Sequence, residues 1–193
     1  MDLKWAVMVG GTGSNLHALI ESGVQVAHVV SHRHGVGALE IAERAGVPAT
    51  VVDPAAFSDR AAFDRAVLHA LDKVPVDGVV MAGFLRKVGP EVVRRYAGRL
   101  INLHPSLLPA FPGLRAVRQA LVYGVKITGV TVHYVTDELD AGPVIAQEPV
   151  RVEERDTEDS LAARIHAVEH RLLPAVVRQL ERDGFRPLPS SGT

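Results

Sequence analysis

The chain has 193 residues, of which 47% are apolar, and its formal net charge is −1. This length suits one domain with a substantial core, and the near-neutral charge argues against a nucleic-acid or membrane-surface binder that works by bulk electrostatics. The absence of cysteine excludes disulfides, thiolate nucleophiles and cysteine-ligated zinc. No run approaches the roughly 18 apolar residues of a membrane span, and the N-terminal apolar stretch is too short for a signal peptide, so we expect a cytoplasmic protein.

Apolar runs of strand length alternate with segments of helical period over the first hundred residues. The strands are predicted at 3–9, 24–31, 47–53, 77–83 and 100–104. The helices are predicted at 15–22, at 37–45, from an N-cap at Ser58 to Lys73, and from a first turn that contains Pro90. This alternation predicts a Rossmann-like α/β fold, with an open, mostly parallel twisted sheet and helices on both faces.

The pattern changes in the last third of the chain. Residues 126–135 and 143–152 are strand-like with no helix between them, which predicts an antiparallel pair. Asp156 or Thr157 should begin a long final helix to Glu181, in which Pro174 should produce a kink. We expect one domain over residues 1–193, with 186–193 as a frayed tail.

A glycine-rich loop, GGTGSN, follows the first predicted strand at residues 10–15. Its glycines permit a tight turn, and Ser14 or Asn15 could cap the next helix, whose positive end favours an anion. Leu16 occupies the third glycine position of the dinucleotide fingerprint, and the lysine of a nucleotide P-loop is missing. The loop therefore suits an isolated phosphate better than NAD or ATP, and a turn without a ligand is the alternative.

Asn102 and His104 end the fifth predicted strand in the stretch NLHPSLLP. Residues two apart on a strand point to the same face, so both side chains can reach one spot above the sheet edge. Pro105, Pro109 and Pro112 stiffen the loop that follows, which suits a pre-organised site.

An amide donor beside an imidazole matches the needs of acyl transfer. The amide and a protonated histidine can stabilise the oxyanion, while the histidine can move the protons. The loop 136–142 offers Asp137, Glu138 and Asp140, and we expect Asp140 to be the partner that favours the charged imidazole. Two alternatives remain. His104 could be a purely structural histidine, or the protein could be a hydrolase that uses Ser106, although the turn around Ser106 lacks the strand–turn–helix elbow of α/β hydrolases.

Four segments, "GGTGSNL", "MAGFLR", "NLHPSLLPAFPG" and "VHYVTDELDAGPVI", resemble in order and spacing the phosphoribosylglycinamide formyltransferases, a family of folate-dependent formyltransferases. The resemblance covers residues 5 to 180. It implies the formyltransferase fold and an enzyme that moves a formyl group from 10-formyltetrahydrofolate to the amino group of glycinamide ribonucleotide, in de novo purine biosynthesis and without a metal.

The resemblance also implies roles for individual residues. Asn102, His104 and Asp140 would be catalytic, with Asp140 tuning the imidazole of His104. Residues that would bind the ribonucleotide are Thr12, Gly13, Ser14, Asn15 and Glu169. Residues that would bind the folate are Arg60, Leu85, Arg86, Lys87, Val88, Asn102, Thr136, Asp137, Glu138, Leu139 and Asp140. Since the family usually has an apolar residue where Lys87 stands, the backbone is the part of Lys87 expected to matter. An apolar cleft behind Phe84, with Leu103 and Val135 as walls, could hold a flat pterin.

Two histidine patterns raise the possibility of a metal. His166, Glu169 and His170 fit the H-x-x-E-H zinc motif, but an acidic third ligand is expected well downstream and only 23 residues follow His170. His28, His32 and His34 cluster without a carboxylate that would complete a ligand set. We therefore expect no metal site.

Other functions remain as alternatives. A formyltetrahydrofolate hydrolase would resemble this chain plus a regulatory domain, and the initiator methionyl-tRNA formyltransferase would add an RNA-binding domain and a basic surface. A non-catalytic nucleotide-binding module would keep the glycine loop without needing Asn102, His104 and Asp140 to meet. A homodimer is compatible with the sequence.

Overall fold

The computed structural model describes residues 3–185, so the tail at 186–193 lies outside the described residues. Its centre is one seven-stranded sheet in the order β3-β2-β1-β4-β5-β6-β7. The strands are β1 (Trp5–Val9), β2 (Val26–Ser31), β3 (Ala49–Val51), β4 (Gly78–Met81), β5 (Leu100–His104), β6 (Ile127–Tyr134) and β7 (Val144–Arg151). Strands β1 to β5 pair in parallel, and β6 pairs antiparallel with β7, as the sequence predicted. Strand β6 also pairs antiparallel with β5, which the sequence did not predict.

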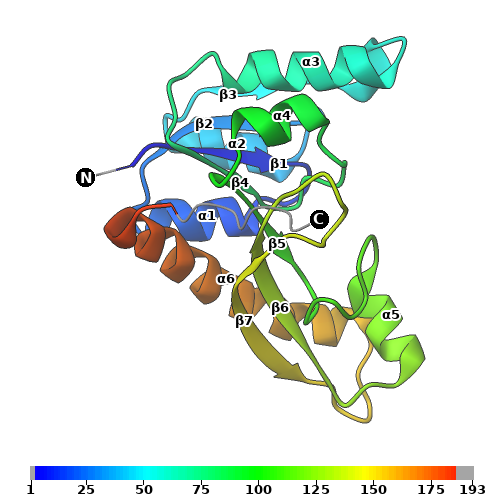
Figure 1. The fold of residues 1–193 in the computed structure, drawn as a ribbon. Coiled ribbons are helices and arrows are strands. Elements are labelled where there is room, and N and C mark those ends of the chain that lie inside the picture. The colour runs from blue at the N-terminus through cyan, green and yellow to red at the C-terminus, as the bar shows by residue number, and fades with distance from the viewer. Residues whose placement is uncertain (1–2, 186–193) are drawn as a thin grey trace, which may run out of the picture.

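Helices cover both faces of the sheet, which confirms the predicted architecture (Figure 1). They are α1 (Ser14–Glu21), α2 (Gly37–Arg44), α3 (Arg60–Leu71), α4 (Pro90–Arg95), α5 (Ala116–Tyr123) and α6 (Glu158–Asp183), with a 3-10 turn η1 (Pro54–Ala56). Alternate residues of β1 divide the core. Trp5, Val7 and Val9 pack with α1, α2 and α6, while Ala6 and Met8 pack with α3 and α4.

Several boundaries differ from the prediction. Asp59 caps α3 in place of Ser58, because the Asp59 carboxylate accepts the N–H of Ala62. The final helix begins after Thr157, as predicted, where Thr157 forms a capping box with Ser160, but it continues through Pro174 to Asp183, beyond the predicted end at Glu181. Helix α5 was not predicted, since the glycine- and proline-rich stretch before it masks its start.

The topology brings the functional loops together. Strands β1, β4 and β5 run in parallel and are adjacent in the order β1-β4-β5, so the glycine loop, the segment after β4 and the proline-rich loop leave the same edge of the sheet. Ligands collect at such carboxyl ends in open α/β sheets. Within residues 3–185, no helix is long and apolar enough to cross a bilayer.

Candidate active site

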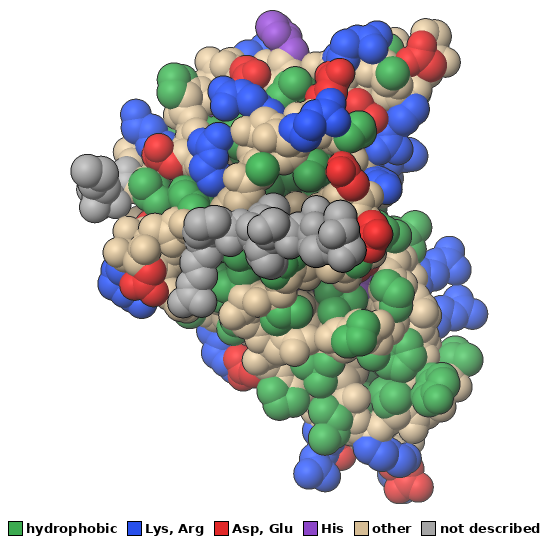
Figure 2. Space-filling view, in the orientation of Figure 1, with side chains coloured by type: hydrophobic (Ala, Val, Ile, Leu, Met, Phe, Trp, Pro, Cys, Tyr) green, Lys and Arg blue, Asp and Glu red, His purple; other side chains and the backbone are tan. Residues whose placement is uncertain are grey.

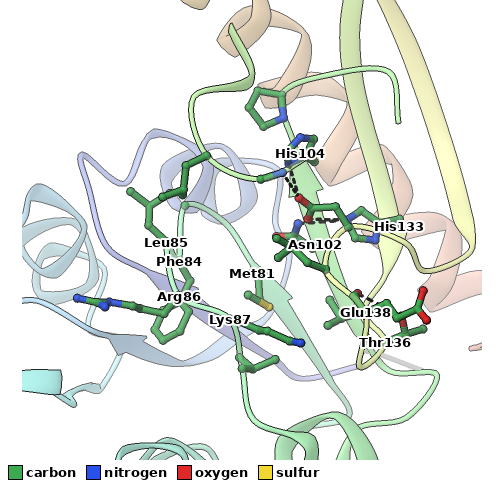
Figure 3. A pocket seen from close by; sticks show the side chains of 18 of the residues that line it. Met81, Phe84, Leu85, Arg86, Lys87, Asn102, His104, His133, Thr136 and Glu138 are labelled. Atoms are coloured by element: carbon green, nitrogen blue, oxygen red, sulfur yellow. Dashed lines mark hydrogen bonds and ion pairs between the residues drawn. The ribbon is translucent and has the colours of Figure 1, made fainter. Parts of the chain in front are cut away.

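A cleft of about 310 Å³ opens at this edge. One wall is the segment 83–88 after β4, and the opposite wall is formed by residues 113–115 and the end of β6 with its following loop. Figure 3 shows Asn102, His104 and His133 pointing toward one another from β5 and β6, with Leu85 and Arg86 on the facing wall. The floor of the cleft therefore carries polar groups between largely apolar walls.

Strand β5 supplies the first two of these groups. Asn102 and His104 both line the cleft, as expected for residues two apart, and His104 is only 5% exposed. Leu103 lies between them and packs into the core on the α6 side, so its predicted role as a cleft wall is wrong. The reason is the strand period, which sends a side chain to the opposite face from its neighbours.

Asp140 reaches the same spot from the loop after β6. Its carboxylate Oδ2 lies 3.5 Å from Nδ1 of His104 and accepts the backbone N–H of Gly113 at 2.7 Å. Nε2 of His104 donates to the carbonyl oxygen of Phe111 at 2.9 Å. The backbone at Asp140 is left-handed, with φ 51°, a conformation in which aspartate is tolerated better than most residues. The three side chains named from the sequence thus converge.

His133 is a fourth polar group that the sequence reasoning missed. It is directly opposite Asn102 in the antiparallel register of β5 and β6, and its Nε2 lies 3.8 Å from Asp140 Oδ1. Burial lowers its pKa and so does the nearby His104, while the Tyr134 carbonyl and Asp140 raise it. Only the pairing register could have revealed this residue, because nothing in the local sequence fixes which residue of β6 faces Asn102.

The side walls include most of the residues expected to bind folate. Leu85, Arg86, Lys87, Val88, Thr136, Glu138 and Leu139 line the cleft, together with Phe84 and Val135. Asp137 and Arg60 are not among its lining residues. Arg60 instead donates from Nε to the Asp64 carboxylate and from Nη2 to the Lys87 carbonyl oxygen, behind the wall.

The mouth of the cleft is apolar. Leu85, Leu114 and Leu139 are all more than half exposed and all line it. A second group of exposed apolar residues, Val122 and Tyr123, belongs to α5, in the part of the surface where Figure 2 shows many hydrophobic side chains. Apolar walls around a few convergent polar groups are typical of a site for a flat organic ligand.

The glycine loop forms a tight connection from β1 to α1. Gly13 is the N-cap residue of α1 with φ 83°, and a Cβ there would lie 2.5 Å from Cα of Ala38. Neither Ser14 nor Asn15 caps the helix, contrary to the prediction, because the left-handed Gly13 takes the cap position and no side-chain cap forms. The helix N-terminus is consequently not blocked by a capping side chain, which leaves its N–H groups for another acceptor.

Glu169 of α6 belongs to the same region. It is 5% exposed, and its Oε2 accepts an N–H from the side chain of Asn15 at 2.8 Å. The Oδ1 atom of Asn15 is buried without a partner. The structure therefore brings together two residues assigned to the ribonucleotide, 154 positions apart.

The residues of the rival interpretations have other partners in the structure. His166 and His170 stack on each other, while Glu169 is turned toward Asn15, and residues 3–185 contain no group of three His, Cys, Asp or Glu that could hold a metal ion. Ser106 is fully buried and donates to the carbonyl oxygen of Ala110, so it cannot serve as a nucleophile.

Comparison with known proteins gives the family. Residues 3–177 match the family described as Formyl transferase. The chain is 38% identical to the phosphoribosylglycinamide formyltransferase of Bacillus subtilis over 92% of its own length and 94% of that protein. It is 41% identical to the human trifunctional purine biosynthetic protein adenosine-3 over 97% of its own length, but spans only 19% of that protein.

A solved structure agrees with these relatives. The glycinamide ribonucleotide transformylase 1 of Symbiobacterium toebii superposes with a TM-score of 0.91 at 42% identity, over 97% of this chain and 94% of that one. Because the alignments cover more than nine tenths of this chain and of the Bacillus subtilis and Symbiobacterium toebii proteins, the similarity extends over the whole domain and is not limited to a shared motif. The chain is a member of the phosphoribosylglycinamide formyltransferases, within the formyl transferase family.

Proposed function

We propose that this enzyme transfers the formyl group of 10-formyltetrahydrofolate to the amino group of glycinamide ribonucleotide, a step of purine biosynthesis. The observation that carries the proposal is the meeting of Asn102, His104 and Asp140 at the floor of one cleft, in a chain that belongs to this family. The Bacillus subtilis relative and the Symbiobacterium toebii structure carry formyl transfer to glycinamide ribonucleotide in their names.

The two substrates would enter from two sides. The pterin of the folate fits the apolar cleft, where the backbone of 85–88 and the loop 136–140 supply polar contacts at its edges. The phosphate of the ribonucleotide fits the N-terminus of α1, held by the loop from Thr12 to Asn15. Glu169 beside Asn15 would bind the sugar or amine end, since a carboxylate accepts hydrogen bonds from hydroxyl and amino groups.

Asn102 and His104 would stabilise the tetrahedral intermediate. When the amine attacks the formyl carbon, negative charge develops on the former carbonyl oxygen. One N–H of the Asn102 amide is directed at His133, which leaves the second N–H for the substrate. A fixed donor of this kind contributes about 2.7–4 kcal/mol to lowering the barrier.

His104 and Asp140 would move the protons. Nε2 of His104 is engaged by the Phe111 carbonyl oxygen, whereas Nδ1 faces the Asp140 carboxylate without a close hydrogen bond. The Nδ1–H of a doubly protonated ring would therefore be the donor that is available to the oxyanion and to the leaving nitrogen. The 3.5 Å separation from Asp140 is long for a hydrogen bond, as is common in catalytic pairs before substrate binds. Asp140 would favour the charged imidazole and accept a proton from the attacking amine, directly or through water. Collapse of the tetrahedral intermediate would break the bond between the formyl carbon and N10 of the folate, and His104 would give its proton to that departing nitrogen. The amide and imidazolium donors supply the stabilisation, so the proposed chemistry calls for no metal.

The test is a direct assay. Purified protein is mixed with 10-formyltetrahydrofolate and glycinamide ribonucleotide in the presence of a chelator, and both the loss of formyl-folate and the formylated ribonucleotide are measured. We expect the two to appear in equal amounts. Loss of formyl-folate at the same rate without ribonucleotide would instead identify a hydrolase, and binding of the ribonucleotide without turnover would identify a non-catalytic module.

A further inference from the structure

A buried carboxylate lies directly behind the wall of the cleft that the segment 83–88 forms. Asp64 on α3 is 9% exposed and accepts from Nε of Arg60 at 2.8 Å with both of its oxygens. Arg60 is one turn earlier on the same helix, and its side chain is 52% exposed. The carboxylate of this ion pair is therefore buried, whereas the arginine side chain is half exposed.

The far end of the guanidinium holds the wall itself. Nη2 of Arg60 donates to the carbonyl oxygen of Lys87. Within residues 3–185, this is the only hydrogen bond made by a backbone atom of the segment 84–88. Phe84 and Val88 anchor the two ends of the segment in the core, whereas Leu85, Arg86 and Lys87 between them are exposed. Without Arg60, the middle of this wall would have no polar attachment.

The backbone after the wall also packs on the same carboxylate. A Cβ on Gly89 would lie 2.6 Å from Cγ and from Oδ2 of Asp64, so only a glycine fits there without displacing the side chain. The negative φ of Gly89, −73°, shows that close approach, and not an unusual backbone conformation, is the reason. Asp64 thus sets the position of the segment at Gly89 through contact and at Lys87 through Arg60.

We propose that Asp64 is a positioning residue for the formyl donor, because its buried carboxylate holds Arg60 in the orientation that fixes the Lys87 carbonyl and with it the 85–88 wall of the cleft. The inference rests on the proposed function, since it takes this cleft to be the folate site.

The kinetic test uses Asp64→Asn, which keeps the size of the side chain and removes its charge. We expect the Michaelis constant for 10-formyltetrahydrofolate to rise about tenfold, with the constant for the ribonucleotide and kcat within about twofold of the parent. Arg60→Lys should reproduce this effect, because a lysine cannot hold a carboxylate and a carbonyl with one planar fork. Asp72→Asn is the matched control: it removes the same charge at the other end of α3, where Asp72 accepts from Tyr96, and should leave all three constants unchanged.

Coupling between the two residues tests whether Asp64 acts through Arg60. If Asp64 acts through Arg60, the double variant should be no worse than either single variant. Multiplied effects in the double variant would show that Arg60 binds the folate independently of Asp64 and would overturn the inference. A rise shared equally by both substrates would also overturn it, because it would indicate a general structural role.

A second measurement does not depend on the enzymatic activity. Trypsin cleaves after Arg86 or Lys87 only when the wall loosens, since a protease needs a locally mobile segment. In Asp64→Asn, cleavage at these two positions should accelerate at least fivefold. Cleavage after Arg115, on the opposite wall, should keep the parental rate in this variant. In Asp72→Asn, every site should be cleaved at the parental rate. Unchanged cleavage at 86 and 87 would refute the inference even if the parent proved inactive, whereas faster cleavage in an inactive parent would refute only the proposed function.

Discussion

The side-chain amide of Asn102 lies 3.1 Å from Nε2 of His133, and this contact fixes which way the amide points. Nδ1 of His133 faces the carbonyl oxygen of Tyr134 at 2.9 Å, so Nδ1 carries the proton and Nε2 must accept. Asn102 therefore presents its nitrogen, and not its oxygen, toward His133. The neutral, buried imidazole acts as the group that orients the proposed oxyanion donor.

The strongest prediction concerns His104. Replacement by alanine removes a proposed oxyanion donor and general acid, so kcat should fall by a factor on the order of 10² to 10⁴. The urea midpoint should change much less. His34→Ala, at an exposed histidine outside the cleft, is the comparison and should retain parental turnover. A His104 variant within a few-fold of the parent would rule out the role given to this residue.

Two substitutions at Asp140 separate chemistry from backbone geometry. Asp140→Asn keeps an acceptor for the Gly113 N–H and tolerates the positive φ, but it loses the charge opposite His104. Asp140→Ala loses all three. Both variants should show turnover reduced at least tenfold, and only the alanine variant should be destabilised as well, by about 1–2 kcal/mol. Thermal melting next to initial-rate measurement checks both expectations, and full activity in the asparagine variant would contradict the assignment.

The glycine loop offers a matched pair of substitutions. A Cβ at Gly13 would collide with Ala38 in a left-handed backbone, whereas a Cβ at Gly11 meets nothing within 4 Å. Gly13→Ala should therefore cost upwards of about 1 kcal/mol of unfolding free energy, and Gly11→Ala much less. Because the loop would hold the phosphate, Gly13→Ala should also raise the Michaelis constant for the ribonucleotide. A rise confined to the folate would reverse the assignment of the two subsites.

The buried histidines predict a loss of stability in mild acid. Burial is the largest cause that lowers the pKa of His133, and the same holds for His28, His32 and His170. In the unfolded chain these groups titrate near pH ~6.5, so below that pH the unfolded state binds protons that the native state does not. Their stabilising contribution is complete above about pH 6.5 and declines as the pH falls toward the native pKa values.

Urea unfolding between pH 7.5 and pH 5 measures this decline. The free energy of unfolding should fall across the acidic half of the range. His28→Gln, which is outside the cleft, should show a shallower decline than the parent because glutamine does not titrate. Equal slopes for the two proteins would show that burial does not shift the pKa of His28.

Much of the site could be read from local sequence. The two-residue spacing of Asn102 and His104 fixes their common face on any strand, and the prolines that follow define a constrained loop. The role of Arg60 in folate binding comes from the resemblance alone and stays a prediction, and the structure adds that its guanidinium contacts Asp64 and the Lys87 carbonyl oxygen. The capping roles expected of Ser14, Asn15 and Ser58 failed for a local reason, since a neighbouring residue, Gly13 or Asp59, occupies each cap position.

The amino-acid sequence by itself determined the parallel sheet, the antiparallel ending and the identity of three polar groups, because strand and helix periods are local properties of the chain. Only the tertiary structure decided that His133 faces Asn102, that Glu169 meets Asn15 and that Asp64 supports the wall of the cleft. These contacts depend on strand register and on helix packing across long separations in sequence. Strand register and helix packing are determined by how the complete core packs together, so no short window of residues encodes these contacts.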